Sequence, residues 1–262
     1  MTMRWISMTN TATSPMHPSL PAKDVHTGTV LFSLLLRTVL FVVFGLLLAA
    51  VLAMAGSDHP FKEAEKWWPF QAILANLATF FMLRYWLRKE GRTYGGLFQL
   101  RKDRVGKDLL QFLWLALVGF ALGGIPLFLF SYWILGSFVP PDLMFQPLPV
   151  WAAAIALIAF PVTNGLVETP TYIGYAMPRL HARLGKLWPA VILAGTALAF
   201  QHVALPLVGD VPYMLWRWTS FLPLAIALGF IFHRTKRLFP IALAHAVMDL
   251  QLAAQLFVVS LG

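Results

Sequence analysis

Residues 109–141 read LLQFLWLALVGFALGGIPLFLFSYWILGSFVPP, a run without Lys, Arg, Asp or Glu. A helix needs roughly 20 apolar residues to cross about 30 Å of hydrocarbon, so this run is long enough to span a bilayer. The whole chain has the same character: 59% of its 262 residues are hydrophobic and only 12% are charged. Soluble domains contain about 25% charged residues. The sequence therefore predicts an integral membrane protein.

Six further stretches share this character. Four of them contain no acidic or basic residue, and they cover residues 38–57, 67–83, 143–167 and 187–209. Among Asp, Glu, Lys and Arg, residues 211–233 contain only Arg217 and residues 238–262 contain only Asp249. The sequence thus predicts an all-α, polytopic membrane helical bundle with about seven transmembrane helices.

The number of helices stays open between six and eight, because residues 109–141 form a long run and because Pro161 and Pro170 can break a helix. Residues 1–28 are rich in Ser, Thr and Pro without an apolar period, which is typical of disorder. Three parts are predicted: a disordered cytoplasmic tail (1–28), N-terminal transmembrane helices with a basic cytoplasmic loop at 84–107 (29–147), and core helices (148–262).

Basic residues concentrate in three of the predicted loops. Residues 84–107 contain eight Lys and Arg, and the groups at 179–186 and 234–237 contain three each. Short cytoplasmic loops retain Lys and Arg, so these loops indicate a cytoplasmic N-terminus and a multi-pass protein of the inner or plasma membrane. The net charge of +9 then reports orientation and attraction to anionic lipid headgroups, and it requires no nucleic-acid partner.

Four ionisable residues fall inside or at the edge of the predicted spans of residues 148–262. They are Glu168, His202, His245 and Asp249. Because ionisable groups are costly in hydrocarbon, each is a candidate functional residue. His245 and Asp249 are four residues apart and should share one helix face.

Arg37 and Arg217 also lie next to or within apolar stretches. Arg side chains near the end of a span can extend along the helix and place the guanidinium at the membrane surface. We therefore expect both to lie at the interface, away from the candidate site.

The candidate residues are compatible with three kinds of chemistry. The chain has no cysteine, which excludes thiol nucleophiles and thiolate metal sites. A carboxylate and an imidazole can deprotonate a water, while a second imidazole stabilises the oxyanion formed at an attacked carbonyl. The same groups can relay protons in a transporter, or bind zinc. The residue types alone leave these possibilities open.

Three short motifs resemble those of the CPBP membrane proteins, which include type II CAAX prenyl endopeptidases and bacterial Abi proteins. The family motifs are Glu-Glu-x-x-x-Arg, Phe-x-x-x-His and His-x-x-x-Asn or Asp, in this order. Their counterparts here are ETPTYIG at residues 168–174, LAFQH at residues 198–202 and HAVMD at residues 245–249. The resemblance covers roughly residues 148–250, and the earlier helices match only in hydrophobic character.

The resemblance implies an intramembrane endopeptidase. Glu168 and His202 would activate water, and His245 with Asp249 would form the oxyanion side. Asn164 and Tyr172, one turn either side of Glu168, are candidate supporting residues. The family has been labelled both metalloprotease and glutamic protease; a metal-free glutamate mechanism is favoured here and zinc is the alternative. The implied partner is a membrane protein or peptide, which in some family members is prenylated.

Three positions depart from the family motifs. Thr169 replaces the second Glu, Ile173 replaces the Arg, and Leu198 replaces the Phe. Losing an acid and a base together avoids an unpaired buried charge, so the change should be compensated, but Glu168 is expected to have one cation fewer beside it. These departures keep open a catalytically impaired scaffold or immunity protein. A proton- or ion-coupled transporter is the second alternative.

Overall fold

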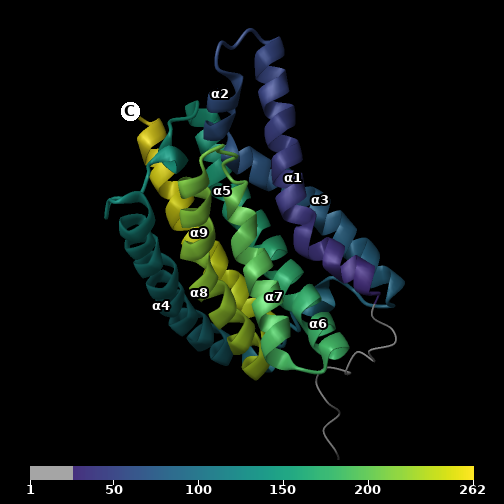
Figure 1. Cartoon of the computed structure of the whole chain (residues 1–262). Helices are drawn as coiled ribbons and strands as arrows, with labels where there is room; N and C mark the ends of the chain where they lie inside the picture. Colours follow the sequence, from purple (N-terminus) through teal and green to yellow (C-terminus); the bar gives the residue numbers. More distant parts are fainter. Residues whose placement is uncertain (1–25) are drawn as a thin grey trace, which may run out of the picture.

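The computed structural model describes residues 26–262, whose regular secondary structure is helical (Figure 1). Each predicted apolar stretch corresponds to one helix. These helices are α1 (Thr27–Met54), α3 (Trp68–Lys89), α4 (Val105–Phe130), α5 (Val150–Thr169), α7 (Leu187–Phe200), α8 (Val211–Thr235) and α9 (Leu238–Ser260). Two short helices, α2 (Pro60–Lys66) and α6 (Met177–Leu184), complete the described part. The predicted helical bundle is confirmed.

Five helical stretches in residues 26–262 are long and apolar enough to cross a membrane. They are Thr27–Met54, Gly95–Leu135, Val150–Leu184, Val211–Thr235 and Leu238–Ser260. Residues Leu187–Val203 form a shorter apolar helix. The chain is therefore a multi-pass membrane protein. The predicted tail lies outside the described residues, except that Thr27 and Gly28 already belong to α1.

The helix that contains the first motif does not break at its prolines. Pro161 lies inside α5, and Pro170 begins a π-helical segment, Pro170–Ala176, that leads directly into α6. A π-helical segment has a wider turn than an α-helix and is frequent at functional sites. Residues 150–184 thus form one continuous rod, with Glu168 and Thr169 at the change of helix type.

The three basic segments meet at one end of the bundle, which we call the basic end. Arg179 of α6 pairs with Glu90 at the end of α3, and Arg237 just before α9 pairs with Asp108 in the first turn of α4. Figure 1 shows α6 at this end, whereas α2 and the C-terminus lie at the other. We call the second the opposite end; it includes the loop at residues 136–149.

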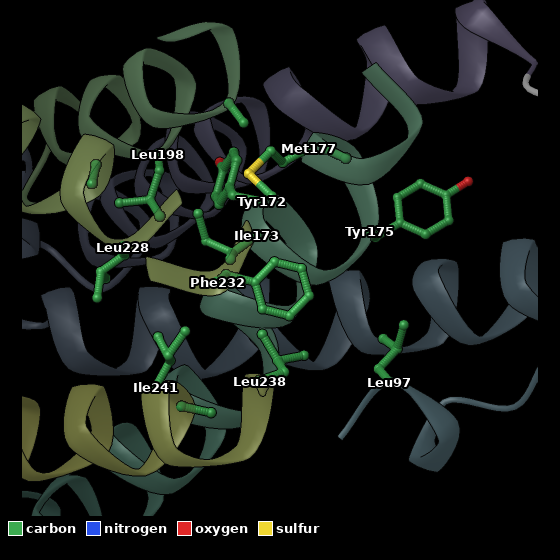
Figure 2. Close-up of a cluster of buried hydrophobic side chains, with 14 of the residues drawn as sticks. Leu97, Tyr172, Ile173, Tyr175, Met177, Leu198, Leu228, Phe232, Leu238 and Ile241 are labelled. Carbon is green, nitrogen blue, oxygen red and sulfur yellow. The ribbon is translucent and has the colours of Figure 1, made fainter. Parts of the chain in front are cut away.

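A cluster of buried apolar side chains fills the bundle toward the basic end (Figure 2). It joins the π-helical segment to α7, α8 and α9. We call it the packed cluster; its members include Leu97, Tyr172, Ile173, Tyr175, Met177, Leu198, Leu228, Phe232, Leu238 and Ile241. Ile173, at the family's Arg position, is 0% exposed. An apolar residue there contributes to packing, which a buried guanidinium would disrupt.

Close packing of α5 on α9 brings the first and third motifs together. Gly165 makes this possible, because a Cβ at this position would lie 2.8 Å from both the Ala242 carbonyl oxygen and the Ala246 Cβ. Small residues allow membrane helices to approach closely. Since Gly165 is one turn before Glu168 and Ala246 follows His245, this contact sets the distance between the two motifs.

Candidate functional site

The four predicted site residues line a single cavity of about 430 Å³. Glu168 comes from α5, His202 from the short 3-10 helix η7 (Gln201–Val203), and His245 and Asp249 from α9. Residues that lie up to 81 positions apart in the chain are therefore brought together. Such convergence around a cavity is the geometry expected of a functional site.

Glu168 is the most enclosed carboxylate of this set, with 2% of its surface exposed. Its Oε2 accepts a hydrogen bond of 2.9 Å from Nη2 of Arg37. Its Oε1 has no hydrogen-bond partner, and Nε2 of His245 lies 3.6 Å away. One oxygen is thus held by a cation, while the other retains free lone pairs beside the cavity.

Arg37 is not at the membrane interface, so the interfacial prediction is wrong. Its side chain is 0% exposed, and it ties α1 to three other segments. Nε donates to Oε1 of Gln201 at 2.6 Å, Nη1 donates to Oδ1 of Asn76, and Nη2 donates to Oδ1 of Asn164 at 2.9 Å. The error arose because α1 begins at Thr27, so Arg37 lies well inside the helix.

This arrangement also overturns the expectation that Glu168 has one cation fewer beside it. The motif position that would supply an Arg contains Ile173, but Arg37 provides a guanidinium from α1, 131 residues earlier in the chain. A buried charge needs a partner because desolvation is costly. A lone Arg in one apolar helix and a lone Glu in another were the available sequence signals for this pair.

The two ionisable residues of the third motif contact one another as the helical spacing predicts. Nε2 of His245 lies 3.5 Å from Oδ2 of Asp249. On the other side of the ring, Nδ1 lies 2.8 Å from Oγ1 of Thr169. Thr169, which replaces the family's second Glu, thus contacts the third-motif histidine. Two carboxylates near Nε2 favour a proton on that nitrogen, where it can be donated.

Asn164 and Tyr172, the two candidate supporting residues, both join the network around Glu168. Nδ2 of Asn164 donates to Oδ2 of Asp249 at 2.8 Å, while its Oδ1 accepts from Arg37. The hydroxyl of Tyr172 donates to Oε1 of Gln201 at 3.3 Å. Asn164 therefore links the two carboxylates of the site, and Tyr172 acts one contact further away.

His202 is fixed by its own backbone and by an aromatic ring. Its Nδ1 lies 3.1 Å from the carbonyl oxygen of Leu198 and 3.2 Å from that of Ala199. Carbonyl oxygens only accept, so Nδ1 carries the proton and Nε2 has a free lone pair. The imidazole stacks on Phe221 with ring centroids 3.8 Å apart. His202 is thereby oriented as a proton acceptor that lines the cavity.

Arg217 is the second arginine for which the interfacial prediction is wrong. It is 5% exposed, and it bonds the carbonyl oxygens of the segment that follows His202. Nη2 donates to Leu205 at 2.9 Å, and Nε donates to His202 at 3.4 Å. Its guanidinium also lies 4.9 Å from the Phe221 ring centroid. Arg217 therefore holds the turn at η7, where the last helical carbonyls lack partners.

The site residues do not present the ligand set of a zinc centre. Among residues 26–262, no group of three or more His, Asp and Glu side chains converges as metal ligands. Structural and catalytic zinc sites use at least three such ligands.

Comparison with known proteins gives one match. Residues 149–251 match the model of the family described as Type II CAAX prenyl endopeptidase Rce1-like. No curated protein and no solved structure matches the chain. The resemblance drawn from the three motifs is confirmed over these residues, which contain Glu168, His202, His245 and Asp249. At the level of the family, the match supports a CAAX-protease-like intramembrane endopeptidase.

Proposed function

We propose that this protein hydrolyses a peptide bond within the membrane, with a water activated by Glu168 and His202. The observation that carries the proposal is the free Oε1 of the buried Glu168. It lies beside a cavity that His202 and His245 also line. A carboxylate held by Arg37 on one oxygen keeps the other available as a base.

The first step, attack of water on the substrate carbonyl, requires a group that accepts a proton from this water. Oε1 of Glu168 removes a proton from water as the water oxygen bonds to the substrate carbonyl carbon. Nε2 of His202, whose lone pair is free, orients the same water by accepting its second hydrogen bond. The proton held by Glu168 then passes to the amide nitrogen as the carbon–nitrogen bond breaks. The products are a carboxylic acid and an amine.

The second requirement is a donor for the oxyanion. Nε2–H of His245 supplies this donor, since Nε2 lies 3.6 Å from the free Oε1 of Glu168. Asp249, whose Oδ2 lies 3.5 Å from Nε2, orients the imidazole, and the Thr169 hydroxyl fixes the ring from the Nδ1 side. A donor aimed at developing charge in a water-poor site is worth about 10²–10³ in kcat. Asp249 thus acts through His245, since an ionised carboxylate would itself repel an oxyanion.

The orientation and the substrate are part of the same proposal. The basic loops support a cytoplasmic N-terminus in the inner or plasma membrane and contact with anionic lipid headgroups. The substrate is a membrane protein or membrane-bound peptide, and a prenyl group on it is an expectation from the family resemblance.

The test is cleavage of a peptide library by the purified protein in detergent. Wild type should cleave at least one peptide, and Glu168→Ala and His202→Ala should each lower kcat/KM by about 10²–10⁴-fold, the usual effect of removing a general base. Asp58→Asn is the control, because Asp58 is an exposed acid that does not line the cavity. Unchanged cleavage by both site variants would contradict the mechanism.

Three additional tests separate the alternatives. A chelator and elemental analysis test for metal: the proposal expects undiminished cleavage with chelator and no stoichiometric metal. A scaffold would retain its cellular phenotype in the Glu168→Ala variant and cleave nothing. A transporter would show ion-dependent uptake in proteoliposomes that the Asp249→Asn variant lacks.

A further inference from the structure

The residues that line the cavity shared by the site residues are concentrated in one part of the bundle. Its walls are formed by residues within 119–128 of α4, 140–145 of the loop after it, 216–228 of α8 and 245–255 of α9. None of the lining residues comes from the basic loops, the π-helical segment or α6. The cavity therefore occupies the half of the bundle away from the basic end.

The lining residues on α9 show how far the cavity extends along the bundle. His245, near the start of α9, lies at the inner end of the cavity, and Gln255, ten residues later, is exposed and still lines it. Ten residues of helix span about 15 Å. Asp142, in the loop at the opposite end, is also exposed and lines the cavity. Phe120 and Phe128 of α4 and Gln251 of α9 are exposed lining residues as well. The exposed part of the lining therefore runs between α4 and α9 from the level of the motif residues to the opposite end, and none of it lies at the basic end.

The packed cluster closes the other direction. Figure 2 shows Tyr172 and Ile173 facing Leu198, with Phe232, Leu238 and Ile241 beneath them. Ile173 and Tyr172 are 0% exposed, and Leu238 is 1% exposed. Protein interiors packed in this way leave few voids larger than a water molecule. A peptide cannot reach Glu168 from the basic end without opening this cluster.

The chemistry of the walls limits what the cavity accepts. Aromatic and aliphatic side chains form most of it, including Phe41, Trp68, Phe160 and Trp216. Its Asp and Glu residues are Asp142, Glu168 and Asp249, against one Lys or Arg side chain, Arg217. An acidic segment is disfavoured by this balance, and an apolar segment is favoured. The volume of about 430 Å³ is in the range of pockets that enclose small ligands.

We propose that the substrate is an apolar peptide segment that enters this cavity from the opposite end, which the positive-inside rule places on the extracytoplasmic side. This inference rests on the proposed function, because it names the substrate of the same site. Substrates are therefore expected on the extracytoplasmic side. They are segments presented at the outer half of the membrane, and the basic loops at the cytoplasmic face take no part in admitting them.

The test of access uses the natural absence of cysteine, so that single cysteines can be introduced without a background. Leu252→Cys reports on the cavity wall and Leu238→Cys on the packed cluster. Ser137→Cys and Lys102→Cys, both exposed, mark the opposite and the basic ends. Each full-length variant is treated with a membrane-impermeant thiol reagent in intact cells and in inverted vesicles.

In intact cells, we expect the reagent to label Leu252→Cys and Ser137→Cys. Lys102→Cys should be labelled in inverted vesicles only. Leu238→Cys should not be labelled in either preparation. Labelling of Leu252→Cys only together with Lys102→Cys, or from neither side, would overturn the proposal. Labelling of Ser137→Cys only in inverted vesicles would overturn the extracytoplasmic assignment. The labelling does not depend on peptide hydrolysis, so a chain that labels as expected but cleaves nothing refutes only the protease.

A pair of glycines on α4 then tests whether the substrate uses this route. A Cβ at Gly124 or at Gly106 would meet no atom within 4 Å, but only Gly124 lines the cavity. Gly124→Leu should lower kcat/KM by about 10- to 200-fold, the range for a misfit in an apolar pocket. Gly106→Leu, near the basic end of the same helix, should leave it unchanged. Equal activity of the two variants would contradict entry through the cavity.

Discussion

The two ends of the bundle differ in how the same apolar helices are used. Toward the basic end, the side chains of the π-helical segment, α7, α8 and α9 interlock in the packed cluster. Toward the opposite end, a second buried apolar cluster joins α1, α3, α5 and the end of α9, and the cavity lies beside it, with walls from α4, α8 and α9. We call the part around the cavity the hollow half. Glu168, His245 and Asp249 lie where the packed half meets the hollow half. These site residues therefore have closely packed side chains on one side and the cavity on the other.

The largest effect on stability is expected at the ion pair on the boundary between the halves. Arg37→Leu leaves the buried Glu168 without its cation and removes the donor to Asn164. Removing one partner of a buried pair costs about 3–5 kcal/mol. The free energy of unfolding in detergent should fall by this amount. The double variant Arg37→Leu, Glu168→Leu should be more stable than Arg37→Leu alone, and a further loss of stability in the double variant would refute the pairing.

A smaller loss of stability is expected from Leu→Ala, and its size should differ between the packed cluster and the cavity wall. Leu238→Ala removes a side chain of the packed cluster that is 1% exposed, and Leu→Ala in a core costs about 2–5 kcal/mol. Leu252→Ala removes the same atoms from the cavity wall, where the side chain is only partly buried. Its cost should be clearly lower when the unfolding of both variants is measured. Equal costs would mean that the halves do not differ in packing.

The smallest change in stability is expected when a glycine is replaced by a larger residue. A Cβ at Gly229 would lie 2.8 Å from Cγ1 of Val191, so Gly229→Leu should destabilise the bundle by about 1–3 kcal/mol. Gly124→Leu meets open space and gains up to about 1 kcal/mol from helix propensity. Thermal unfolding of both variants in the same detergent is the measurement. A loss of stability for Gly124→Leu as large as that for Gly229→Leu would contradict the hollow half.

The helices and the candidate residues could be read from the sequence because they depend on local pattern. Runs without charge gave the seven long helices, and the spacing of His245 and Asp249 gave their contact. The ion-pair partner of Glu168 could not be predicted from such local patterns. Arg37 is 131 residues away in the chain, and the motif pointed to position 173, which the structure uses for apolar packing.

The role of Thr169 was also hidden in the sequence. As a replacement for a glutamate it looked like a lost function, yet its hydroxyl lies 2.8 Å from Nδ1 of His245. The side of the membrane from which the cavity is reached depends on packing between α4, α8 and α9, which no single motif encodes. Local patterns therefore identified the candidate residues, and tertiary contacts determined their partners and their position around the cavity.

Hydrolysis by an activated water is tested most directly by isotope incorporation. Purified wild-type protein is incubated with the peptide library in water enriched in oxygen-18, and the new C-termini are analysed by mass spectrometry. The account predicts one oxygen-18 atom in each new carboxylate for wild type and no new C-termini for Glu168→Gln. Labelled products formed equally well by Glu168→Gln, or no products from wild type with any peptide, would contradict it.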